Sequence, residues 1–158
     1  MKTLQFAPHN LPKPTCPDIY ILKEGEDYDY NKPYAIDNGF NEWLYNFPAT
    51  DLECKYLTKT TGILHRLPTD EEFTELLKTK TDMPNVVFAG FCHGGSCFGR
   101  GYSGYYWSSS VYTPSPTSSW SRFLTYTCAA VVRDNDAQTY ASSARTVIEI
   151  QEWKDIEL

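Results

Sequence analysis

The sequence predicts an α+β domain in which two helices precede a small antiparallel sheet with long loops. Two helix starts can be read near Thr50 and Thr69, and from residue 86 the apolar spacing changes from helical to strand-like. Stretches rich in Gly, Pro, Ser and Thr separate the predicted strands, as is typical of loops. The length of 158 residues fits one domain.

Residues 1–33 are expected to form an N-terminal arm outside the main domain, which would span residues 34–158. The arm contains five prolines and an acidic cluster at residues 24–30, and 19–22 reads as a short strand within it. We expect the remainder of the arm to be extended and to wrap on the domain or on a neighbouring molecule.

The first helix is predicted from a capping box. Thr50 is followed three residues later by Glu53, so the Thr side chain could cap the helix while the carboxylate reaches back. Gly62 is the expected C-terminal stop. Thr69 and Glu72 repeat the capping-box pattern at the second helix. The buried stripe of that helix is expected to contain Phe73, Leu76 and Leu77.

Strands are predicted over residues 86–91, 105–110, 120–132 and 146–150. Residues 120–132 alternate with period two, which assigns neighbouring side chains to opposite faces of the sheet. One face would carry Trp120, Arg122, Leu124 and Tyr126, and the other Ser121, Phe123, Thr125 and Thr127. Core residues that hold the backbone are expected to include Trp107, Trp120, Leu124 and Val147.

Composition excludes several classes of protein. The net charge of −6 argues against a nucleic-acid partner, because phosphates require clustered Lys and Arg. The N-terminus has no apolar run of signal-peptide length and no later run could span a bilayer, so we expect cytoplasmic synthesis without membrane insertion. The five cysteines are an odd number and widely scattered, so we do not expect a disulfide framework to be the main source of stability.

Residues 96–146 have the composition of a binding surface. They contain 17 Ser or Thr, 6 Tyr and two Trp, but only six charged side chains. Tyr and Trp give a large contact area at little cost in rotamer freedom, whereas Ser, Thr and Gly supply adaptable hydrogen bonds, as in antibody binding loops. The alternative is that these residues form the polar side of an ordinary sheet.

Several short motifs, in a fixed order, carry a family resemblance. They are Arg66–Phe73 (Arg-Leu-Pro-Thr-Asp-Glu-Glu-Phe), Phe88-Ala89-Gly90-Phe91, Phe98-Gly99-Arg100-Gly101, Tyr106-Trp107-Ser108-Ser109-Ser110, Trp120-Ser121-Arg122 and Arg145-Thr146-Val147. Together they resemble the major-paralogous-domain group of C-type lectin-fold proteins, and more narrowly the variable proteins of diversity-generating retroelements. The resemblance covers roughly residues 34–148. The chain departs from the family at Ala141-Ser142-Ser143-Ala144, where Gly, a bulky apolar residue and Ser commonly precede the Arg.

The resemblance implies a C-type lectin fold and a non-enzymatic function in ligand binding. In such proteins a reverse transcriptase diversifies the 3′ end of the gene at template adenines, so a variable region at about residues 92–145 would sit on a constant framework. The expected ligand is a host-surface or other macromolecule, with a protein favoured, and the expected location is a virion, as a host-attachment component, or a microbial surface. No cofactor or metal is expected. The candidate ligand-binding residues are Tyr102, Ser103, Tyr105, Tyr112, Ser121, Phe123, Thr125, Thr127, Val132, Asp134, Asp136 and Tyr140.

The same residues allow other interpretations. Asp134-Asn135-Asp136 could suggest calcium-dependent sugar binding, but the triplets that such lectins use are missing and a turn is favoured. Cys92, His93 and Cys97 resemble zinc ligands, although a structural site needs four, so free or locally paired thiols are favoured. The alternatives to a diversified binder are a fixed surface lectin and a degenerate enzyme of the formylglycine-generating type, whose chemistry needs a late cysteine pair where this chain has only Cys128.

The three late arginines allow two interpretations. They could form a site for an acidic ligand, or they could brace strands by bidentate bonding to carboxylates and carbonyls, which is the favoured interpretation. They are Arg122, Arg133 and Arg145.

Overall fold

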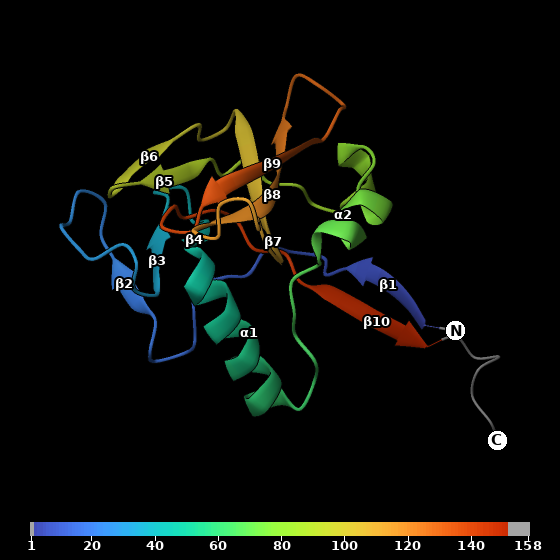
Figure 1. Ribbon diagram of the computed structural model, residues 1–158, viewed down its shortest axis with the longest axis horizontal. Helices are drawn as coiled ribbons and strands as arrows, with labels where there is room; N and C mark the ends of the chain where they lie inside the picture. Colours follow the sequence, from blue (N-terminus) through green and yellow to red (C-terminus); the bar gives the residue numbers. More distant parts are fainter. Residues whose placement is uncertain (1, 152–158) are drawn as a thin grey trace.

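Between residues 2 and 151, which the computed structural model describes, the chain forms two α-helices, one 3-10 helix and ten strands (Figure 1). This confirms the α+β class and the number of helices. The strands, however, are divided among four small sheets, of two, three, two and three strands, instead of the single sheet expected. No helix among residues 2–151 is long and apolar enough to cross a membrane.

The N-terminal segment is built into the domain. Strand β1 (Lys2–Phe6) pairs antiparallel with β10 (Val147–Gln151), and Figure 1 shows this two-stranded ribbon extending from the body of the molecule. Strand β2 (Tyr20–Leu22), which was predicted, lies parallel to β3 (Tyr34–Asp37), which in turn pairs antiparallel with β4 (Trp43–Tyr45). The N-terminal segment thus packs on the domain, which is one of the two arrangements expected for it.

Between β1 and β2, hydrogen bonds tie the segment down. The Leu11 amide donates to the Ala144 carbonyl at 2.7 Å. The amides of Thr15 and Cys16 donate to the Glu53 carboxylate at 3.0 and 2.8 Å, and Glu53 is almost fully buried. The buried charge thus has backbone donors as its compensation, as a buried carboxylate requires.

Helix α1 (Phe47–Thr61) begins four residues earlier than predicted, because its cap lies four residues before Thr50. Its cap is Asn46, whose side chain accepts from the Ala49 amide at 3.1 Å. The same side chain accepts from the Tyr34 amide and donates to two carbonyls of the preceding loop, so long-range contacts select this start. Thr50 lies inside the first turn, where its hydroxyl bonds to the Phe47 carbonyl. The capping-box prediction for this helix was therefore wrong.

The other helix signals are confirmed. Gly62 ends α1 in the left-handed conformation, with φ of 73°. Helix α2 (Asp70–Leu76) has the complete capping box of Thr69 and Glu72. Its buried side is formed by Phe73 and Leu77, with Leu76 partly buried beside them.

The largest sheet joins β7 (Ser103–Val111), β8 (Ser118–Thr125) and β9 (Val132–Ala137) in antiparallel order. Residues 120–132, predicted as one strand, thus belong to two strands and the loop between them. Beside this sheet lies the hairpin of β5 (Phe91–His93) and β6 (Ser96–Phe98).

The strand predicted at residues 86–91 does not form before Phe91, and residues 86–89 are irregular. The amide and carbonyl of Val87 are both bonded to the Tyr106 hydroxyl, at 3.1 Å each, so a side chain takes the place of a neighbouring strand. Gly104 on β7 allows the backbone of Val87 to approach this strand closely, because a Cβ at Gly104 would come within 2.9 Å of the Val87 carbonyl oxygen.

Candidate recognition surface

One face of the β7–β8–β9 sheet collects most of the predicted ligand-binding residues. Tyr105 lies opposite Phe123, which lies opposite Val132, so the three side chains project from the same face. In the same way the register places Asp134 and Asp136 on this face, opposite Ser121 and Ser119. The alternation predicted for residues 121–125 is therefore confirmed.

The neighbouring hairpin extends this face with further rings. The Phe91 ring contacts Tyr105, with centroids 5.0 Å apart, and Tyr105 contacts Phe123 at 4.9 Å. Phe91 also stacks on Tyr140 at 5.7 Å and lies 5.4 Å from Phe98. A continuous row of rings thus crosses from one sheet to the next. We call the combined surface the aromatic–acidic face; its members are Phe91, His93, Phe98, Tyr105, Phe123, Val132, Asp134, Asp136 and Tyr140.

The face is accessible to a partner. Phe98 and Val132 are 49% and 48% exposed, and His93, whose ring lies 4.4 Å from that of Tyr140, is exposed as well. Tyr105, Phe123 and the two aspartates are half-buried. Contiguous apolar and aromatic surface of this kind marks interaction sites in proteins.

The two aspartates give the face a negative charge. The Ser121 hydroxyl donates to the Asp136 carboxylate at 2.6 Å. Burial raises the pKa of Asp136 above its usual range, and the neighbouring charge of Asp134 adds to the rise while the Ser121 hydrogen bond opposes it. Within residues 2–151, neither carboxylate has a Lys or Arg ion-pair partner.

The opposite face of the sheet is closed. Tyr106 and Leu124 pack against α2, and the Arg122 guanidinium bonds to the Asp70 carboxylate at 2.8 Å and to the Asp70 carbonyl. Arg133 makes a bidentate bond to the same carboxylate, with a shortest distance of 2.6 Å. Burial alone would raise the pKa of Asp70, but the bonds from Arg133 and Arg122 outweigh it and lower the pKa.

The predicted bracing role of the late arginines is thereby confirmed. Arg122 and Arg133 brace β8 and β9 against α2 through Asp70. Arg145 is fully buried and bonds to backbone carbonyls. Those carbonyls belong to Ala7, Pro84 and Asn85.

Trp120 does not belong to the buried core as expected. It is half-buried on the closed face, where the Arg133 guanidinium lies 3.5 Å from its ring centroid. Tyr112 contacts the edge of the same ring at 4.8 Å, so this predicted ligand-binding residue lies away from the aromatic–acidic face.

The remaining predicted residues fall into two groups. Ser103 and Ser121 are buried and so offer almost no surface of their own; the Ser121 hydroxyl donates to the Asp136 carboxylate. Tyr102 is 65% exposed and its ring contacts Tyr126 at one end of the sheet. Thr125 and Thr127 lie at that same end, with their hydroxyls 3.4 Å apart.

Three members of the aromatic–acidic face were missed from the sequence, namely Phe91, His93 and Phe98. The Gly94-Gly95 pair between two short segments of matching pattern is a hairpin signal that could have found them. The hairpin is closed by a disulfide between Cys92 and Cys97, which face each other across the strands. Free or locally paired thiols were both left open from the sequence, and the structure has the local pair; Cys92 is buried on the side away from the rings.

No family model, curated protein or solved structure matches this chain. Among residues 2–151, no group of three or more His, Cys, Asp and Glu side chains is arranged to hold a metal ion. The function is therefore inferred from the geometry of the chain itself.

Proposed function

We propose that this chain is a non-enzymatic binding protein that recognises a partner protein through the aromatic–acidic face. One observation above all supports this function: side chains predicted from the sequence to bind a ligand converge on one accessible face with a continuous row of aromatic rings. Exposed aromatic rings held by neighbouring strands are typical of the residues that contribute most to protein–protein affinity.

The charge of the face narrows the partner chemistry. Asp134 and Asp136 lie beside Tyr105 and Phe123, and no Lys or Arg within residues 2–151 forms an ion pair with either. The best partner would place an apolar side chain on the rings and a Lys or Arg beside the carboxylates, so that the rings leave water and the carboxylates gain an ion pair. Because Asp136 is already partly desolvated, such a cation would recover more energy there than at a fully hydrated carboxylate.

We further propose that the scaffold is a C-type lectin fold and that the face is diversified, as in the retroelement variable proteins that the sequence resembles. The division between a closed and an open face of one sheet supports this idea, because residues on the open face can change without breaking the Asp70 network. Attachment of a virus to its host, or display on a microbial surface, would be the corresponding use.

The enzyme alternative gains no support from the cysteines. Cys92 and Cys97 are joined to each other and cannot act as thiolates in this state. Cys128 is an exposed thiol in the loop after β8. A fixed binding surface, in contrast, remains the main alternative to a diversified one, and the following experiment separates the two.

The 3′ half of the gene should be sequenced from many members of one natural population. We expect substitutions to concentrate at open-face positions such as Tyr105, Phe123 and Val132. The strands supply matched controls. Tyr106 is encoded next to Tyr105 and Arg122 next to Phe123, but both of these controls face the core. Ser121, which is buried, should stay constant or change only to small residues.

The outcomes separate the hypotheses clearly. Variation on open-face positions, arising at template adenines and sparing the adjacent core positions, would support a diversified binder. Equal variation at adjacent open and core positions would contradict it, since this would be ordinary drift. An invariant open face would indicate one dedicated partner.

A further inference from the structure

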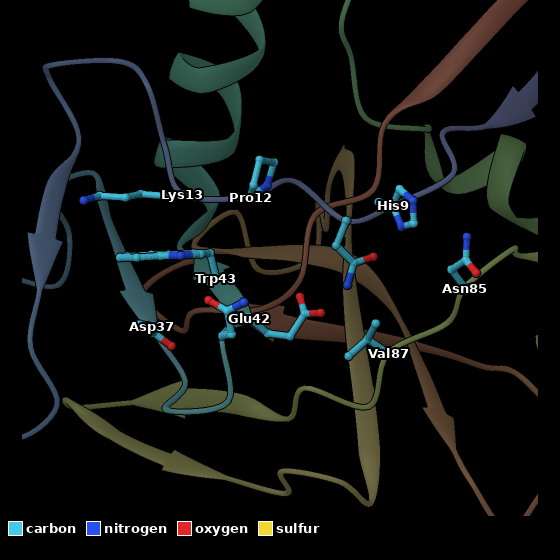
Figure 2. Close-up of a pocket in the computed structure, with 10 residues that line it drawn as sticks. His9, Pro12, Lys13, Asp37, Glu42, Trp43, Asn85 and Val87 are labelled. Carbon is cyan, nitrogen blue, oxygen red and sulfur yellow. The ribbon is translucent and has the colours of Figure 1, made fainter.

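A cavity lies apart from the aromatic–acidic face and shares no residue with it. It has a volume of about 540 Å³ and is bounded by residues 9–13, by the connection from β3 to β4, and by residues 85–87. Figure 2 shows Glu42 near its centre, with Trp43 on one side and Val87, His9 and Asn85 on the other. Cavities of about 300–1,000 Å³ are usual for small ligands.

Glu42 is a half-buried carboxylate with no side-chain partner in the described part of the chain. Within residues 2–151 it has no side-chain hydrogen bond or ion pair. Burial raises its pKa, while the more distant charges of Arg145 and His9 oppose the rise. Arg145 does not pair with it, because its guanidinium bonds to Asn10 and to three carbonyls.

Asn10 contributes an unused donor to the same cavity. Its side-chain oxygen accepts from Arg145 at 2.8 Å, which fixes the amide with Nδ2 as the remaining group. The residue is only 9% exposed, and Nδ2 is buried with no hydrogen-bond partner among the described residues. Burial raises the pKa of Tyr106 and the nearby Asn10 side chain opposes the rise, while the Tyr106 hydroxyl accepts from the Val87 amide and donates to the Val87 carbonyl. A buried donor needs an acceptor, which a bound ligand or an ordered water supplies.

Trp43 supplies a surface that attracts cations. The ammonium of Lys13, an exposed residue, lies 5.9 Å from the centroid of its ring. Trp43 and Glu42 both line this cavity, which therefore offers an ammonium group two attractive contacts, the ring face and the carboxylate. The net charge of −6 attracts a cationic ligand at longer range.

We propose that this pocket binds a primary ammonium group adjacent to a carbonyl, the chemistry of a peptide N-terminus or of an amino-acid amide. The ammonium pairs with Glu42 beside Trp43, and the carbonyl oxygen accepts from Asn10 Nδ2. A neutral polyol would satisfy Asn10 but would leave the Glu42 charge uncompensated, so the cation is favoured. Capture of terminal amines is a known mode of peptide recognition.

The test is a titration of the ¹⁵N-labelled full chain followed by NMR. Glycinamide is the probe, and N-acetylglycinamide is the matched control that keeps the carbonyl and removes the charge. We expect saturable shifts of the Asn10 side-chain amide and the Trp43 indole N–H with glycinamide alone. Triglycine amide then separates the two sources: tighter binding than glycinamide identifies a peptide N-terminus, and equal affinity identifies the small amide.

The matched variants are Glu42→Gln and Asp18→Asn, an exposed carboxylate outside the pocket. Glu42→Gln should weaken glycinamide binding about tenfold or more, because it removes a charge-assisted hydrogen bond, and Asp18→Asn should not change it. A thermal melt checks that both variants fold. Equal binding of the acetylated probe, preferential binding of methyl glucoside, or no saturable shift with glycinamide would each overturn the proposal.

Discussion

The two faces of the β7–β8–β9 sheet differ in how their side chains are held. On the face toward α2, Arg122 and Arg133 share the Asp70 carboxylate, and Leu124 is completely buried. On the aromatic–acidic face, rings contact mainly other rings, and the two aspartates carry no ion pair within residues 2–151. Adjacent residues of one strand thus have opposite tasks: one set specifies the fold and the other is available for contact.

The side of the sheet that carries the aromatic–acidic face is not exposed along its whole length. Trp107 has the same orientation as Tyr105 but is fully buried, packed against α1 with its indole N–H donating to the Tyr45 carbonyl at 2.8 Å. The open part of the face therefore begins beyond Trp107. Strand alternation alone does not define a surface; the elements that cover each end must also be known.

The largest expected effect is that of Asp70→Ala. This change leaves Arg122 buried with its charge uncompensated, and breaking a buried pair in this way costs about 3–5 kcal/mol. The matched change on the open face, Asp134→Ala, should cost less than about 0.5 kcal/mol. Urea denaturation of both variants measures the difference in the free energy of unfolding. Equal losses would contradict the division between a closed and an open face.

The same network predicts a response to acid. The pKa of Asp70 is lowered in the folded chain, so its ionised form stabilises the fold above the ordinary pKa of an aspartate. That stability is lost as the pH falls through the lowered value. Asp70→Ala should therefore differ most from the unmodified chain near neutral pH and least in strong acid.

The sequence predicted local structure well where the signal was local. Thr69 and Glu72 predicted the start of α2, and Gly62 the end of α1, because both devices depend on residues within one turn. The start of α1 was missed because Asn46 is held by contacts with residues 30–34, which local capping patterns do not reveal. The four sheets were missed for a similar reason, since β1 pairs with β10 from the far end of the chain.

Replacing Trp120 is expected to cost less stability than replacing the fully buried Trp107. Because its ring is half-buried between Arg133 and Tyr112, we expect Trp120→Ala to cost about 1–2 kcal/mol, including the loss of a cation–π contact. Trp107→Ala, in a fully buried site, should cost about 3–5 kcal/mol. Thermal melts of the two variants provide the test. A loss at Trp120 as large as that at Trp107 would place Trp120 in the core after all.

The candidate surface shows where prediction from the strand pattern ended. Alternation in residues 121–125 correctly separated Phe123 from Leu124. It could not show that Ser121 is covered, since that depends on the position of Asp136 on the next strand. Nor could it bring Phe91 beside Tyr105, because the hairpin and the sheet meet only through tertiary packing.

The smallest expected effect concerns Asp136 on the open face. Burial raises its pKa in the folded chain, and Asp134 adds to the rise while the Ser121 hydrogen bond opposes it. The folded state therefore binds this proton more tightly than the unfolded state does. The contribution of Asp136 to stability is complete below the ordinary pKa of an aspartate and is lost as the pH rises through the raised value.

Asp136→Asn should remove that loss, because the amide oxygen can still accept from Ser121 but carries no charge. At neutral pH the variant should be more stable than the unmodified chain by less than about 1 kcal/mol, and the advantage should disappear in acid. Asp134→Asn should give a smaller change in the same direction, since it removes only the neighbouring charge. Urea denaturation over a series of pH values measures both. A pH-independent difference would mean that Asp136 is better hydrated than its burial indicates, and a cationic partner would then gain less by pairing with it.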